Sequence, residues 1–185
     1  MTDLAIQQLA SWQSFYVIVG SSGAALIGIQ FVVIALVANV RRLVTTAASI
    51  STFATPTVVH LGGALVVSAV MSAPWPSLSG ASTALTMCAL GGLGYATLVM
   101  RRARRQTDYK PLREDWVWYA VLPCGAYAAL AAGALLLSTA TQAAEFVIAA
   151  AALGLLLIGI HNAWDTVTYI VVAGVHVEDA NKKKM

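Results

Sequence analysis

The sequence predicts an all-α integral membrane protein, a bundle of five transmembrane helices with the N-terminus outside and the C-terminus in the cytoplasm. Composition is the first reason. Of 185 residues, 59% are hydrophobic and 10% are charged, and the mean hydropathy is +0.77. A typical soluble domain has roughly a quarter of its residues charged. The composition therefore excludes an ordinary soluble domain.

Five apolar runs are the second reason, because a helix needs about 20 apolar residues to cross the hydrocarbon core of a bilayer. The runs predict helices over residues 14–40, 50–73, 81–100, 116–138 and 143–173. The segments between them are short, so we expect residues 1–185 to form a single transmembrane domain.

Local signals mark the ends of these helices. The first run stops at Arg41-Arg42. Thr55-Pro56 offers an alternative start for the second helix, because a capping threonine and a first-turn proline favour helix starts. The turn "APWPSLSG" precedes the third helix, and the charged segment "RRARRQTDYKPLRED" precedes the fourth. Pro123 predicts a kink near the start of the fourth helix, since proline disrupts the hydrogen bonds of the preceding turn.

The basic residues are the third reason and predict the orientation. All 11 lysines and arginines fall on one side of the predicted membrane, and short cytoplasmic loops are enriched in these residues. We expect the arginines at helix ends to contact anionic lipid headgroups and to set the topology: Arg41, Arg42, Arg101, Arg102, Arg104 and Arg105. This placement explains the pI of about 9.0 without a nucleic-acid partner. It predicts a multi-pass protein of the plasma (inner) membrane.

Polar side chains inside three of the predicted helices form the candidate functional site. At a rise of about 1.5 Å per residue, five of them fall in the cytoplasmic half of the bundle: Gln30, His60, His161, Asn162 and Asp165. Polar and ionisable residues within membrane helices generally face a cavity or one another. We therefore expect these five to line a pore, or a path for an ion or ligand.

The motif "GIHNAWDT" supplies three of these residues. His161 and Asp165 are four residues apart and share one helix face, so the carboxylate can accept a hydrogen bond from the imidazole and fix its tautomer. Asn162 lies one position round the helix, and we expect it to bond a neighbouring helix. In an alternative, the helix ends near Ala163, and Asp165 meets water beside an interfacial Trp164. The apolar continuation "TVTYIVVAGVHV" favours a longer helix.

Glu145 lies at the opposite end of the same predicted helix. We expect it in the first turn, where a carboxylate complements the helix dipole and needs no function. The alternative is the outer mouth of a cation pathway.

Small residues are abundant in four of the five runs, as in "CGAYAALAAGA" of the fourth. Small residues at helix faces let backbones approach closely, which is a principal source of association in lipid. One five-helix bundle does not obviously need so many small faces. We therefore expect a homo-oligomer.

The predicted function is a small oligomeric membrane channel or transport protein for ions or a small polar solute, conducting cations or gated by protonation of histidine. The sequence has no GxxxxGK[ST], HExxH, GxSxG or CxxC motif, and we expect no enzyme. Two alternatives stay open. One is an accessory or regulatory membrane subunit with no chemistry. The other is a haem or metal protein using His60 and His161, with Asp165 as a further metal ligand. The cofactor, if any, is not specified by the sequence.

Overall fold

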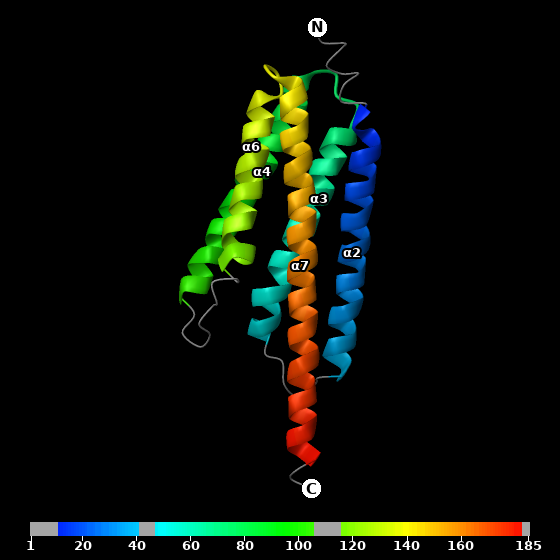
Figure 1. Cartoon of the computed structure of the whole chain (residues 1–185), viewed down its shortest axis with the longest axis vertical. Helices are drawn as coiled ribbons and strands as arrows, with labels where there is room; N and C mark the ends of the chain where they lie inside the picture. The colour runs from blue at the N-terminus through cyan, green and yellow to red at the C-terminus, as the bar shows by residue number, and fades with distance from the viewer. Residues whose placement is uncertain (1–10, 41–46, 106–115, 183–185) are drawn as a thin grey trace.

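The computed structural model describes residues 11–40, 47–105 and 116–182, and all regular structure within them is helical. The elements run up and down along one long bundle, with the two chain ends at opposite ends (Figure 1). They are α2 (Gln13–Val40), α3 (Ala47–Ser72), α4 (Leu78–Arg105), the π-helical turn η1 (Val117–Val121), α6 (Leu122–Leu136) and α7 (Thr141–Lys182). Upper and lower below follow Figure 1.

Five helical spans are long and apolar enough to cross a membrane: Gln13–Ala35, Thr55–Ser72, Leu78–Arg102, Val117–Leu136 and Thr141–Thr168. The prediction of an all-α chain with five such helices is therefore confirmed. The exposed arginines Arg101, Arg102 and Arg104 lie near the lower end of α4, and the Arg104 guanidinium lies 5.6 Å from the centroid of the Trp116 ring. Arg41 and Arg42 lie outside the described residues. Which side of a membrane this end faces stays a prediction.

The long helix α7 organises the bundle. It packs against α2, α3, α6 and η1, and more than half of its apolar span is buried. By contrast, less than a quarter of the α2 and α4 spans is buried within the chain. Most of the surface of these two helices is therefore available to lipid or to another chain.

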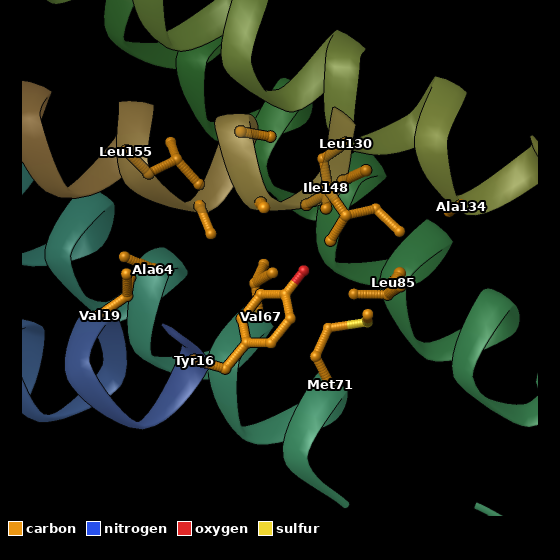
Figure 2. Packing of buried hydrophobic residues seen from close by; sticks show 14 of the residues in the cluster. Tyr16, Val19, Ala64, Val67, Met71, Leu85, Leu130, Ala134, Ile148 and Leu155 are labelled. Carbon is orange, nitrogen blue, oxygen red and sulfur yellow. The ribbon is translucent and has the colours of Figure 1, made fainter. Parts of the chain in front are cut away.

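The core is built from apolar side chains of all five helices (Figure 2). Leu61, Leu85, Leu130 and Leu155 are fully buried, and the ring of Tyr16 lies among the core residues. Lipid tails are as apolar as leucine, so burial from water cannot hold such helices together. Van der Waals contact and close backbone approach do so instead.

The start of α3 differs from the alternative that Thr55-Pro56 suggested. The helix begins at Ala47, and Pro56 lies inside it. Proline in a membrane helix is tolerated because neighbouring helices and local adjustments satisfy the freed backbone groups. Pro56 is buried. The apolar part of this helix nevertheless begins at Thr55. Thr55-Pro56 therefore marks where the apolar composition begins, whereas the helical backbone starts earlier, at Ala47.

The fourth span is irregular where Pro123 predicts it. The turn η1 immediately precedes α6, and the Leu122 N–H donates to the Val117 carbonyl, five residues back. Proline lacks an N–H, and its ring clashes with the carbonyl four residues earlier. A widened turn is one way to relieve that clash. The turn η1 also carries Trp118.

Candidate polar pathway in the lower half of the bundle

A close contact between α3 and α7 sets the height of the candidate site. Gly159 has no side chain, and a Cβ there would lie 2.5 Å from the Cδ2 atom of Leu61. The two helices run in opposite directions (Figure 1). His60 adjoins Leu61, and His161 follows Gly159 by two residues, so the structure places both histidines near one level of the bundle.

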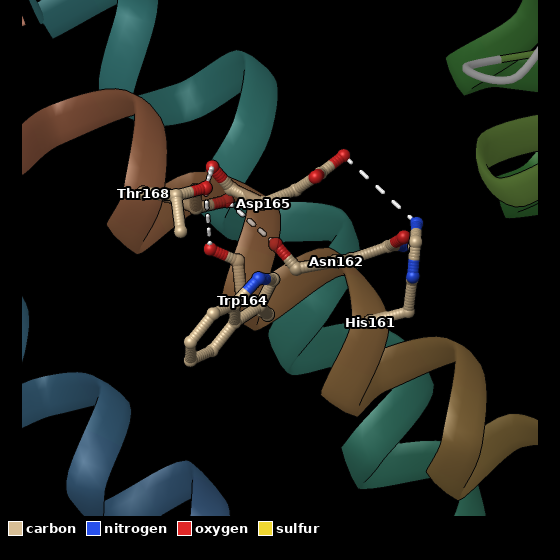
Figure 3. A network of polar contacts seen from close by, with 6 residues as sticks. His161, Asn162, Trp164, Asp165 and Thr168 are labelled. Atoms are coloured by element: carbon tan, nitrogen blue, oxygen red, sulfur yellow. Dashed lines mark hydrogen bonds and ion pairs between the residues drawn. The ribbon is translucent and has the colours of Figure 1, made fainter. Parts of the chain in front are cut away.

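His161 lies between a carboxylate and an aromatic ring. Its Nε2 atom is 4.0 Å from the Oδ2 atom of Asp165, one turn further along α7 (Figure 3). Its ring stacks on Trp118 of η1, with centroids 3.7 Å apart and planes 15° from parallel. A separation of 4.0 Å is too long for a hydrogen bond, so the strength of the contact with Asp165 depends on a positive charge on the imidazole.

Sequence reasoning missed Trp118. The available signal was the aromatic run "WVWY" at the start of the fourth span. That run is also typical of an interfacial aromatic belt. Which of its rings contacts His161 depends on how the fourth span is rotated about its own axis, and the run does not specify that rotation.

Asn162 is completely buried, with 0% of its surface exposed. Within the described part of the chain, neither its amide nitrogen nor its amide oxygen has a hydrogen-bond partner. The expectation that Asn162 bonds a neighbouring helix is therefore wrong. Such a bond needs a free polar group at the same height on that helix, and the buried polar side chains that α3 offers near this level, His60 and Thr57, already have interactions of their own.

His60 is engaged by Tyr127 of α6. Its Nδ1 atom is 3.3 Å from the Tyr127 hydroxyl, and its ring also meets the edge of Tyr95 with centroids 6.3 Å apart. Glycines on both sides make room for Tyr127. A Cβ at Gly63 would lie 2.9 Å from the tyrosine hydroxyl, and one at Gly92 would overlap the tyrosine ring. His60 is thus bound into the packing of α3, α4 and α6.

Gln30 is also buried, at 6% exposed. Among the described residues, no hydrogen bond or ion pair joins Gln30 to the other four predicted site residues. The structure therefore brings together His161, Asp165 and Asn162 on α7, with His60 at the same level in a separate aromatic contact and Gln30 on α2 without a hydrogen bond or ion pair to them.

The three polar side chains on α7 differ in their exposure. The side chain of Asp165 is 46% exposed and that of His161 is 28% exposed, whereas Asn162 is fully buried. The helix is continuous through this region to Lys182, and its apolar span runs to Thr168; where the membrane surface crosses α7 stays a prediction. Asp165 and His161 are therefore partly exposed, whereas Asn162, which lies between them in the sequence, faces the interior of the bundle.

A metal site finds no support in this geometry. No group of three or more His, Cys, Asp or Glu side chains that could hold a metal ion occurs in the residues that the structure describes. His60 and His161 contact different aromatic rings, Tyr127 and Trp118.

Comparison of the chain with protein-family models, curated proteins and solved structures finds no match. A functional interpretation of this chain therefore depends on the chemistry of its own side chains. Together, the imidazole and the carboxylate can donate and accept hydrogen bonds and can interact with a cation.

Proposed function

We propose that this chain is a small oligomeric membrane channel or transport protein that passes protons or monovalent cations along the path from Asp165 through His161 to Asn162. The observation that supports the proposal is the buried, unpartnered amide of Asn162. Leaving a buried donor or acceptor unsatisfied costs about 1–3 kcal/mol. Water or an ion entering from the exposed end of the path would satisfy both amide atoms.

The competing interpretation is an accessory subunit in which polar residues only hold helices together. That interpretation expects the buried polar side chains to bond across helices. His60 does so, through Tyr127. Asn162 does not, and His161 and Asp165 meet each other within one helix. The buried amide of Asn162 therefore adds no hydrogen bond between helices, which supports a path, whereas the stacking of His161 on Trp118 is itself a contact between two spans.

His161 is the proposed gate. When its imidazole is protonated, the stacked Trp118 ring gains a cation–π attraction of about 0.5–2 kcal/mol, and Asp165 gains an ion-pair partner. The charged ring is then held between the two groups. The neutral ring loses both electrostatic contacts and is freer to turn. Flux should therefore depend on pH through this residue.

Purified protein in liposomes tests the proposal. Proton and potassium fluxes are followed with entrapped dyes for the unmodified protein, His161→Ala and Asp165→Asn. We expect each variant to change the flux by about fivefold or more, the equivalent of about 1 kcal/mol. Leu157→Ala is the matched control, because Leu157 lies on the same helix and is 52% exposed. Equal flux in all four proteins would reject the path, and no flux in any of them would favour the accessory subunit.

Outward-facing glycines support the oligomer. At Gly28, Gly91, Gly94 and Gly125, an added Cβ would meet no described atom within 4 Å. The bundle therefore does not use these glycines for its own close packing, and their flat surfaces suit contact with a second copy. Light scattering of the detergent-solubilised particle, corrected for bound detergent, measures the subunit number. A monomer would reject this part of the proposal.

A further inference from the structure

Glu145 on α7 lies outside the proposed path and differs from its expected environment. It is 2% exposed, and the first turn of α7 contains no acidic residue. Favourable interaction with the helix dipole fades beyond the first turn, so the dipole does not account for this carboxyl group. A buried carboxyl group can be neutralised by a proton. Its burial alone therefore defines no site for a ligand.

An apolar groove of about 250 Å³ lies between α3 and α4. Gly62 and Val66 of α3 line one side, Met87 and Gly91 of α4 line the other, and Tyr127 of α6 lies at the base. Val66 and Met87 are 47% and 69% exposed, whereas Tyr127 is 3% exposed. The groove therefore opens to the outer surface of the bundle and is closed beneath by α6.

Glycines keep the groove open. A Cβ at Gly62 or at Gly91 would meet no described atom within 4 Å. The groove lies between the apolar spans Thr55–Ser72 and Leu78–Arg102, so its surroundings in a membrane are hydrocarbon rather than water. An unfilled apolar groove forfeits van der Waals contacts, on which the packing of membrane helices depends. We therefore expect an apolar group from outside the bundle to fill it.

One face of α4 joins the groove to a positive charge. Met87, Gly91 and Tyr95 line the groove at intervals of four residues. Arg102 follows Tyr95 by seven residues, which is about two helical turns or about 10 Å, so it continues the same face of α4. The charge of Arg102 is close enough to the Tyr95 hydroxyl to interact with it.

The described part of the chain does not balance the positive charge at this end of the groove. Arg101 and Arg102 are exposed, and no ion pair joins either of them to a described carboxylate. Segment 101–115 has six basic residues and three acidic ones, so its net charge is positive. Basic residues at the end of a membrane helix attract anionic headgroups.

A negatively charged phospholipid matches both the groove and the arginine. Met87 lies about 22 Å along α4 from Arg102, and half of a hydrocarbon core is about 15 Å thick. An acyl chain whose headgroup contacts Arg102 thus ends between Tyr95 and Met87, within the groove. We propose that the groove and Arg102 form one binding site for an anionic phospholipid. This site does not depend on the path through His161.

A second copy of the chain is the other candidate for the groove. Copies in one membrane share an orientation, so a second α4 in this groove would set its own arginines beside Arg102, where like charges repel. A negatively charged lipid balances Arg102 instead. With a lipid in the groove, the contact between copies rests on Gly28, Gly94 and Gly125, which lie outside it.

Native mass spectrometry of the detergent-solubilised protein tests the site. The protein is titrated with dioleoylphosphatidylglycerol or dioleoylphosphatidylcholine, which share their acyl chains and differ in headgroup charge. We expect one phosphatidylglycerol per subunit, bound more tightly than phosphatidylcholine. Arg102→Gln should weaken phosphatidylglycerol binding about fivefold. Arg104→Gln, the matched control, should weaken it less, because the Arg104 guanidinium lies over the Trp116 ring rather than on the groove face.

Gly62→Leu tests the groove, because the larger side chain takes up the open space and should weaken phosphatidylglycerol binding several-fold. Ala69→Leu, at an exposed position of the same helix outside the groove, should not. Equal binding of the two lipids, or equal losses in Arg102→Gln and Arg104→Gln, would show unspecific attraction and overturn the proposal. Unchanged lipid binding in Gly62→Leu, with or without a changed subunit number, would overturn it too. Arg102 is exposed, so its variant keeps the test decisive where Gly62→Leu fails to fold.

Discussion

Replacing Asn162 with leucine should stabilise the protein and impair transport at the same time. Leucine has a similar volume but no polar atoms, and both amide atoms of Asn162 are buried without a described partner. Removing an unsatisfied buried group recovers about 1–3 kcal/mol. The separated helices in a membrane also find partners for polar groups, so we expect a gain near the lower end of this range, about 1 kcal/mol.

Two measurements on the same preparation check this prediction. For a chain of this size, about 1 kcal/mol corresponds to a rise in Tm of about 2–4 °C, and the liposome flux should fall at least as far as in His161→Ala. Leu157→Ala again serves as the control, with little change in either quantity. A lower Tm together with normal flux would refute the reasoning, because it would mean that Asn162 has a stabilising partner and no role in the path.

Three further predictions concern the contacts around the site. Gly92→Ala should destabilise the protein by about 1–3 kcal/mol through overpacking, since its methyl group would overlap the Tyr127 ring, whereas Gly62→Ala meets no described atom within 4 Å and should leave the Tm unchanged. Tyr127→Phe should lower stability by about 1–2 kcal/mol, because it removes the hydroxyl near the Nδ1 atom of His60; an unchanged Tm would show that this contact is not stabilising. Trp118→Leu removes the ring stacked on His161, the proposed gate. We expect it to flatten the pH dependence of flux while changing the Tm little. An unaltered pH profile would show that the indole of Trp118 has no part in gating.

The five helices were predictable from the sequence because the bilayer constrains the backbone so strongly. A segment in lipid must satisfy its hydrogen bonds internally, so the length and composition of an apolar run almost suffice to indicate a helix. Pro123 was equally informative, since the irregular turn η1 directly precedes the helix that begins at this proline. Pro56 was less so, because a proline signals disruption without saying whether the helix starts there or continues through it.

The environments of the polar side chains were not predictable in the same way. The spacing of His161 and Asp165 indicates a shared face within one helix, and they do lie one turn apart. The Trp118 stack, the missing partner of Asn162 and the burial of Glu145 depend on how each helix is rotated against its neighbours. Rotation and tilt are set by packing between helices rather than by hydropathy, and an apolar run is nearly the same on every face.

The separation of the buried polar residues along α7 bears on the proposed transport. At about 1.5 Å per residue, Glu145 and Asn162 lie roughly 25 Å apart, close to the thickness of a hydrocarbon core of about 30 Å. Between them the helix buries apolar side chains, including Ile148 and Leu155, which are 0% exposed. This packed apolar layer interrupts a polar path along α7, so we expect transport to require movement of α7 against its neighbours and flux to saturate with cation concentration.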